Sequence, residues 1–305
     1  MLANEFLVKV AERSRQAYAQ RMEQERRETG RADGMAIRRS VTTSAGATEI
    51  YLYQPVQPKK MGLLPVFVNI HGGGFIQGSP GDDDPWCRQI ADAVNCAVVS
   101  IDYHLAPEYR FPVTVYECYD VIKWLHDQAV FLGMDPGRIA VGGHSAGGNL
   151  AAALTLLARE RREFSFVFQV LNYPVLDFVR DPYEKIGQDL LLTAKAQSFF
   201  SACYLEDAGA ARNPLASPIL AESFAGLPPA LVIAAGFDPL RAENERYAEA
   251  LKSAGVAVTY RLFPGCMHAF THFGPEAAAN DAWRLIQDSL RQAFWGKEEG
   301  PDGEC

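Results

Sequence analysis

The sequence predicts an α/β protein in which a mostly parallel central sheet is flanked by helices on both faces. Short apolar runs alternate with longer helical patterns along most of the 305 residues. Several of these runs are apolar at every position, which is typical of strands that are covered on both faces. Hydrophobic residues make up 48% of the chain, enough to fill a large core.

The elements follow one another in a regular order after an amphipathic helix expected over Leu2–Arg27. The charged face of this helix mixes Glu with Arg, so we expect it to cap the main domain rather than to bind a membrane. The expected strands are Ala36–Val41, Glu49–Tyr53, Leu63–Ile70, Ala97–Tyr103, Ile139–Val141, Phe166–Tyr173, Ala230–Ala235 and Val256–Leu262. The expected helices between and after them are Pro85–Val94, Val113–Phe131, a run ending at Ala158, Thr193–Leu205, Leu240–Ala254 and Glu276–Phe294.

One stretch interrupts this alternation. Between the strand that ends near Tyr173 and the strand Ala230–Ala235, charged and aromatic residues mix without a clear period, as expected of an insertion above a site. The chain is therefore divided as follows: 1–34 N-terminal cap helices, 35–177 first part of the core, 178–213 cap insertion, 214–296 second part of the core, and 297–305 flexible tail.

Composition excludes several classes of protein. The net charge is -8 and the chain has no basic stripe, so a nucleic-acid partner is not expected. Its six cysteines are scattered without a C-x-x-C pair, which indicates free thiols and a cytoplasmic location. Charges at Lys9, Glu12 and Arg13 break the first apolar run, so neither a signal peptide nor a membrane span is expected.

The segment Ile139 to Ala158 carries the strongest catalytic pattern. An apolar strand passes through Gly143-His144-Ser145-Ala146-Gly147 into an alanine-rich helix. This is the G-x-S-x-G arrangement that lifts a serine hydroxyl above the end of a sheet, and its glycines allow the strand and the helix to approach closely. We therefore expect Ser145 to be a nucleophile.

A second glycine-rich segment, His71-Gly72-Gly73-Gly74-Phe75, follows the strand Leu63–Ile70. Consecutive glycines expose backbone N–H groups that bind an anion. The spacing fits neither G-x-x-x-x-G-K-[ST] nor G-x-G-x-x-G, so a nucleotide is not expected. Together with a nucleophilic serine, the segment is interpreted as half of an oxyanion hole.

Of the six histidines, His268 is the preferred general base because it lies in the loop after the last strand. His104 also follows a strand, but earlier in the chain. His268 and His272 have the spacing of H-E-x-x-H, but Ala269 replaces the required glutamate, so no metal is expected. No organic cofactor is expected either.

Two aspartates are candidates for the acid that orients the base. In this kind of site the order along the chain is serine, acid, histidine. Asp238 ends an apolar strand beside the loop of His268 and is preferred. Asp177, after the preceding strand, is the alternative.

These motifs together resemble the hormone-sensitive-lipase family of α/β-hydrolase carboxylesterases, over roughly residues 35 to 295. The segments that carry the resemblance are His71-Gly72-Gly73-Gly74, Asp102-Tyr103-His104-Leu105-Ala106-Pro107-Glu108, Gly143-His144-Ser145-Ala146-Gly147-Gly148, Asp238-Pro239-Leu240-Arg241 and His268-Ala269-Phe270. The resemblance implies a helical cap, a triad of Ser145, Asp238 and His268, and an oxyanion hole made by the N–H groups of Gly73, Gly74 and Ala146. Two positions depart from it: the family usually has Asp at His144 and Arg at His104.

The expected function is hydrolysis of a small-molecule ester, with short or medium acyl chains, through an acyl-enzyme. Activity should fall below about pH 6, where a histidine base becomes protonated. Two alternatives are a non-catalytic binding protein, which His268 argues against, and an amidase. The strand Val256–Leu262 is a candidate edge for a homodimer. The candidates to line an apolar pocket are Phe75, Trp86, Tyr183, Phe199 and Tyr204.

Overall fold

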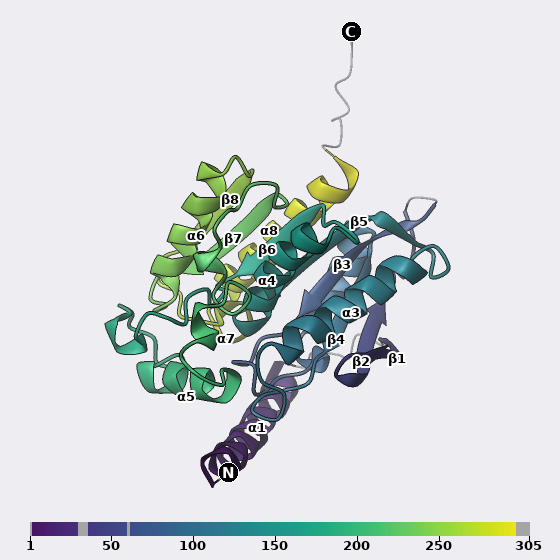
Figure 1. Cartoon of the computed structure of the whole chain (residues 1–305). Coiled ribbons are helices and arrows are strands. Elements are labelled where there is room, and N and C mark those ends of the chain that lie inside the picture. The colour runs from purple at the N-terminus through teal and green to yellow at the C-terminus, as the bar shows by residue number, and fades with distance from the viewer. Residues whose placement is uncertain (1, 30–35, 60–61, 297–305) are drawn as a thin grey trace.

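The computed structural model of the chain describes residues 2–29, 36–59 and 62–296. An eight-stranded sheet in the order β1-β2-β4-β3-β5-β6-β7-β8 forms its centre (Figure 1). Only the pairings β1–β2 and β2–β4 are antiparallel, and the remaining pairs are parallel. The strands are β1 Ile37–Thr43, β2 Gly46–Tyr53, β3 Leu64–Ile70, β4 Ala97–Asp102, β5 Met134–His144, β6 Phe168–Asn172, β7 Ala230–Ala235 and β8 Val258–Phe263.

Helices cover both faces of this sheet, as the sequence predicts. In Figure 1, α3, α4 and α6 lie in front of the sheet, while α8 lies behind it. The helix α2 contacts α8 and so belongs to the rear layer. The described helices are α1 Leu2–Thr29, α2 Asp84–Val94, α3 Val113–Gln128, α4 Ala146–Arg161, α5 Ala194–Tyr204, α6 Arg241–Ser253, α7 Phe270–Phe273 and α8 Glu276–Trp295.

The buried apolar residues form two clusters, as two covered faces require. Every residue of β7 and every residue of β3 after Leu64 is buried, which explains the largely apolar sequence of both strands. The strand β5 begins at Met134, five residues before the expected Ile139, because Leu64 pairs with Met134 ahead of a register shift. The predicted segment 297–305, together with part of 1–34, lies outside the described residues.

The helices α1 and α5 lie at the same end of the molecule (Figure 1). The segment that contains α5 leaves the core after β6 and returns at β7. Its short 3-10 turns are Pro182–Glu184, Ala210–Arg212 and Pro218–Leu220. Across the described residues, none of the helices combines the length and apolar character needed to cross a membrane.

Candidate active site

Ser145 lies at the junction of β5 and α4, in a backbone conformation that few non-glycine residues adopt. Its φ is 55° and its ψ is -115°. A Cβ atom on Gly147 would lie 1.9 Å from the carbonyl oxygen of Ile70, so α4 begins in direct contact with the end of β3. The glycines therefore let the helix start directly behind the serine, which raises the hydroxyl above the sheet.

The three residues that the sequence selects for a triad lie in one hydrogen-bonded chain. The Nδ1 atom of His268 is 2.7 Å from a carboxylate oxygen of Asp238, and its Nε2 atom is 2.8 Å from Oγ of Ser145. The second oxygen of Asp238 accepts from the N–H of Leu240 at 2.8 Å. This arrangement allows His268 to take a proton from Ser145 while Asp238 holds the ring.

The environment of His268 favours its protonated form. Burial by itself disfavours the charge, but the carboxylate of Asp238, through its charge and its hydrogen bond, raises the pKa of His268 above its usual value. Asp189 adds to this effect. The alternative acid, Asp177, does not contact His268: its carboxylate accepts from the N–H groups of Val179 and Arg180.

The loop after β3 turns sharply in front of Ser145. Gly73 and Gly74 have φ values of 112° and 61°, and the carbonyl of Gly73 accepts from the N–H groups of Ile76 and Gln77. Ala146 is the first residue of α4, where an N–H has no partner within the helix. Among the described residues, nothing accepts a hydrogen bond from the N–H groups of Gly73, Gly74 or Ala146. These groups are therefore available to an oxygen atom bound beside Ser145.

Known proteins resemble this chain in sequence and in fold. The sequence pattern of the α/β hydrolase fold matches residues 67–272 of the chain. The chain is 41% identical over 247 residues to the carboxylic ester hydrolase LipN of Mycobacterium tuberculosis. This match covers 77% of this chain and 66% of LipN. The chain belongs to the hormone-sensitive-lipase family of α/β-hydrolase carboxylesterases. It is accordingly a serine carboxylesterase, an enzyme that hydrolyses carboxylic esters.

Two further proteins show how far the likeness extends. The esterase is 37% identical over 247 residues to an arylesterase of Saccharolobus solfataricus, covering 80% of this chain and 79% of the arylesterase. A solved structure of EstE1, a thermostable carboxylesterase cloned from a metagenomic library, superposes with a TM-score of 0.84 at 36% identity. That superposition covers 92% of this chain and 97% of EstE1, so the likeness includes nearly the whole fold.

A narrow cavity opens beside Ser145 in the esterase. Its apolar lining comes mainly from Phe75 on the glycine loop, Phe178 after β6 and Phe200 on α5. Lys185 also reaches the cavity, but its ammonium lies 2.6 Å from the buried carboxylate of Glu243, which compensates its charge. The segment that leaves the core after β6 thus supplies much of the cavity wall.

Of the five aromatic residues that the sequence proposes for a pocket, Phe75 alone lines this cavity. Tyr204 lies behind it, with its ring stacked on Phe75 at 3.7 Å between centroids. Trp86 packs against Trp283 in the rear layer. The side chain of Tyr183 is 73% exposed, and Phe199 packs beside Phe200 without reaching the cavity. Aromatic residues on one helix face different ways, which composition alone does not reveal.

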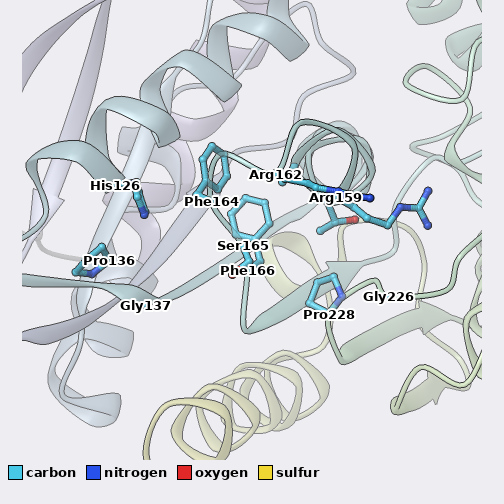
Figure 2. A pocket seen from close by; sticks show the side chains of 12 residues that line it. His126, Pro136, Gly137, Arg159, Arg162, Phe164, Ser165, Phe166, Gly226 and Pro228 are labelled. Carbon is cyan, nitrogen blue, oxygen red and sulfur yellow. The ribbon is translucent and has the colours of Figure 1, made fainter.

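A larger and more open hollow lies at the opposite end of the sheet (Figure 2). Its walls include Pro136 and Gly137 at the start of β5, and Phe166 and Pro228 just before β6 and β7. Catalytic groups in a parallel sheet gather at the carboxyl ends of the strands, and none of the three triad candidates reaches this hollow. It therefore takes no part in the chemistry described above.

Contacts that the sequence does not reveal support the esterase site from the side of α1. The guanidinium of Arg15 donates to the carbonyl oxygens of Ile76 and Ala106, each at 2.7 Å, and pairs with Glu108. Ile76 belongs to the same loop as Gly73. The helix α1 therefore braces the far end of the glycine loop, although its sequence shows only an amphipathic pattern.

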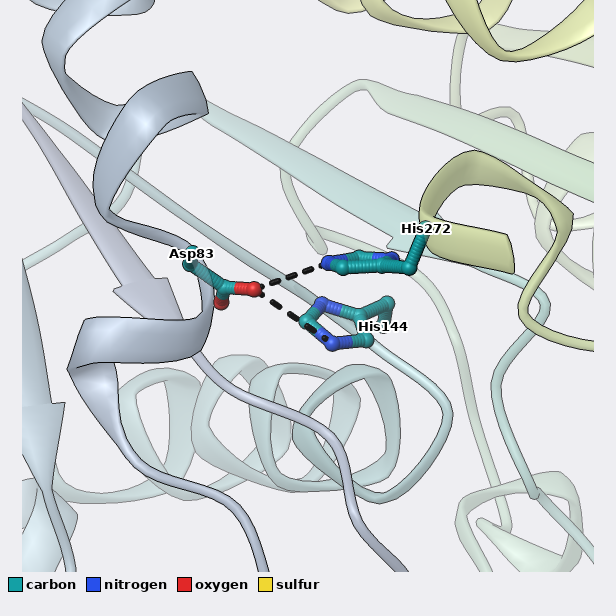
Figure 3. Close-up of side chains that lie close together, drawn as sticks. All are labelled: Asp83, His144 and His272. Carbon is teal, nitrogen blue, oxygen red and sulfur yellow. Dashed lines mark hydrogen bonds and ion pairs between the residues drawn. The ribbon is translucent and has the colours of Figure 1, made fainter. Parts of the chain in front are cut away.

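Asp83, His144 and His272 form a buried cluster behind the glycine loop (Figure 3). Asp82, Asp83 and Asp84 form an acidic run before α2, a pattern that predicts helix capping rather than metal binding. For Asp83 the capping prediction is wrong, because its side chain makes no capping hydrogen bond and turns inward. Its Oδ1 atom is 2.9 Å from Nε2 of His272 and 3.7 Å from Nε2 of His144. Two imidazoles and a carboxylate are metal ligands in other proteins, but here the Nε2 atom of His144 already accepts from the N–H of Gly72. Hydrogen bonds within the protein therefore already engage Nε2 of His144 and Nε2 of His272.

Proposed function

We propose that the esterase acts through an acyl-enzyme formed on Ser145, with His268 as general base and Asp238 as the residue that orients it. The hydrogen-bonded chain from Asp238 through His268 to Ser145 carries this proposal. His268 takes the hydroxyl proton as Ser145 attacks the ester carbonyl. The same proton then passes to the departing alcohol, and a water molecule activated by His268 releases the acid.

The N–H groups of Gly73, Gly74 and Ala146 would hold the negative charge that develops on the carbonyl oxygen. All three belong to segments that flank Ser145, and among the described residues they have no other acceptor. Donors that are already oriented stabilise the transition state more than the ground state, which raises kcat. The proposed chemistry requires no cofactor.

We further propose that the substrates are small-molecule esters with short or medium acyl chains. The cavity beside Ser145 is closed on one side by Phe200 and on another by Phe75. Phe200 is fixed against the glycine loop, since a Cβ atom on Gly74 would lie 2.7 Å from its ring. A cavity limited by rigid aromatic walls favours chains that end before they reach the wall.

Replacement of Ser145 by alanine tests this proposal. With p-nitrophenyl esters from acetate to palmitate, we expect the parent to prefer the shorter acids and to show burst acylation, and Ser145→Ala to lose both burst and turnover. The control is Ser165→Ala, an exposed serine in the hollow at the other end of the sheet. Turnover of Ser145→Ala at the parent rate would contradict the mechanism. A matched p-nitroanilide tests the amidase alternative in the same assay.

The structure also suggests how the remaining parts are used. We propose that α1 and residues 178–213 act as a cap, since the first braces the glycine loop and the second lines the cavity. A homodimer paired through β8 is supported by the position of that strand at the edge of the sheet. A cytoplasmic location is supported by the five described cysteines, all of which are free and buried.

A further inference from the structure

We propose that His144 is a positioning residue of the oxyanion hole, and that Asp83 and His144 work as one pair. This inference rests on the proposed role of the glycine loop in ester hydrolysis. His144 directly precedes Ser145, but its side chain forms its hydrogen bond with the glycine loop rather than with the triad. It holds Gly72, the residue directly before Gly73.

The contact between His144 and Gly72 is close and directional. The backbone N–H of Gly72 donates to Nε2 of His144 at 3.0 Å. A Cβ atom on Gly72 would lie 2.6 Å from the ring of His144, so glycine is needed for the two to meet. One hydrogen bond thus ties the strand end that carries Ser145 to the loop that carries Gly73 and Gly74.

His144 makes this contact as a neutral ring. An Nε2 atom that accepts a hydrogen bond has no proton of its own, so the single ring proton is on Nδ1. Burial lowers the pKa of His144 to about 3, and the ring therefore stays neutral wherever His268 can act as a base. A neutral acceptor holds the loop without adding charge beside the reacting atoms.

Asp83 holds this ring in place from the other side. It is an anion: although burial disfavours its charge, the hydrogen bonds that it accepts from His272 and Asn69 keep its pKa below the usual range of an aspartate. Its carboxylate accepts from Nε2 of His272 at 2.9 Å and from Nδ2 of Asn69 at 2.8 Å. The ring of His272, fixed in this way, packs on the ring of His144 with 4.2 Å between centroids (Figure 3).

The pair divides two functions between two residues. His144 offers the acceptor to Gly72, and Asp83 brings a carboxylate to within 3.7 Å of the imidazole of His144. An exchanged pair, with Asp at 144 and His at 83, should again offer one acceptor to Gly72 and one carboxylate to the cluster.

This relationship is tested with four changes: His144→Ala, His144→Gln, His144→Asp, and the double change Asp83→His with His144→Asp. The control is His126→Ala, at a half-buried position on α3 beside the hollow at the other end of the sheet. For each protein, kcat and KM are measured with p-nitrophenyl butyrate. The Ki of a butyl trifluoromethyl ketone is measured as well, because its adduct with the serine places an oxyanion in the hole. The Tm reports on folding.

We expect His144→Ala to lower kcat about 10-fold or more with KM within about 2-fold, because misplaced donors weaken binding of the transition state alone. The Ki of the ketone should rise in parallel. His144→Gln, whose amide oxygen reaches the position of Nε2 and accepts the same N–H, should retain most of the activity. His144→Asp alone should be the least active and stable, because it buries two carboxylates together, and the double change should recover both properties.

The proposal is overturned if His144→Ala keeps the kcat and ketone affinity of the parent. It is also overturned if the double change is no better than His144→Asp. If His144→Ala folds too poorly to assay, His144→Gln and the double change decide, and loss of activity in both would contradict the proposal. Ser145→Ala tests the acyl-enzyme mechanism independently of His144. If Ser145→Ala is inactive and His144→Ala has normal activity, only the proposed role of His144 is refuted.

Discussion

The backbone N–H of His268 donates to the carboxylate of Asp189, a residue of the segment that leaves the core after β6. The same carboxylate accepts from the N–H groups of Leu191 and Leu192, which shapes the chain around it. Next to it, the N–H of Gln188 donates to the carbonyl of Phe237, the residue before Asp238. The cavity wall and the catalytic loops are therefore joined by direct hydrogen bonds.

Replacement of Asp189 by asparagine should shift the pH profile of the esterase to lower pH. The negative charge of Asp189 contributes to the raised pKa of His268, so removing it lowers that pKa and keeps the base neutral in more acidic solution. Asparagine keeps one of the two acceptor oxygens, so the plateau of kcat/KM should fall less than it does with alanine. The pH dependence of kcat/KM for Asp189→Asn and the parent measures the shift.

Alanine at the same position provides the comparison. Asp189→Ala removes both the charge and the acceptors. It should therefore lower the maximal kcat/KM as well as shift the acidic side of the pH profile to lower pH. An acidic limb that stays in place in both variants would show that Asp189 does not influence His268.

The parent enzyme should lose activity as the pH falls through a value above about 6.5, the ordinary pKa of histidine. The sequence alone suggested a fall below about pH 6, but the carboxylate of Asp238 raises the pKa of His268. The effect on stability has the opposite sign. The pairing of protonated His268 with Asp238 contributes fully below the unfolded pKa and is lost as pH rises through the folded pKa. Both pH dependences are tested by measuring kcat/KM and Tm for the parent and for His268→Asn over the same pH range. If the kcat/KM of the parent falls only below pH 6, the predicted pH dependence of activity is contradicted.

Much of the fold follows from local patterns in the sequence. Strands such as β3 and β7 are buried on both faces, so they appear as unbroken apolar runs whose ends are easily located. Since the carboxyl ends of parallel strands share one edge, Ser145, Asp238 and His268 could be selected from their positions after strands. The structure adds the distances between them.

Other features of the site depend on tertiary contacts that no local pattern contains. Asp83 lies before a helix, where an aspartate ordinarily caps, yet the approach of His272 from nearly two hundred residues away turns it into a buried anion. Asp189 lies in a segment without helical or strand periodicity, so its contact with His268 has no signature. The aromatic residues on α5 looked equivalent, and only packing distinguishes Phe200 from Phe199.

Replacement of Gly73 by alanine should abolish most of the activity. A Cβ atom there would lie 2.0 Å from the carbonyl oxygen of Gln77, and the φ of 112° adds about 1–3 kcal/mol of strain for any other residue. The loop must then move away from Ser145, and kcat should fall about 100-fold. Gly81→Ala, in the same connection but with Ser79 Oγ 3.5 Å away and no positive φ, is the matched control for kcat and Tm. Equal activity of the two variants would argue against a tightly held loop.

Replacement of Phe200 by alanine should extend the range of acyl chains that the esterase accepts. The ring of Phe200 lines the cavity beside Ser145 and lies against Gly74, so its removal lengthens the space available to the substrate. Each added methylene that becomes buried contributes about 0.8 kcal/mol, so kcat/KM for longer chains should rise about 3- to 4-fold per carbon until the new wall is reached.

The neighbouring ring offers a control for this change. Phe199 lies next to Phe200 on α5 and packs beside it, but it does not line the cavity. Phe199→Ala should therefore leave the preferred chain length of p-nitrophenyl esters unchanged, even if its Tm falls. The same shift in both variants would mean that a looser α5, rather than a wider cavity, admits the longer chains. No shift in Phe200→Ala would place the acyl group elsewhere in the esterase.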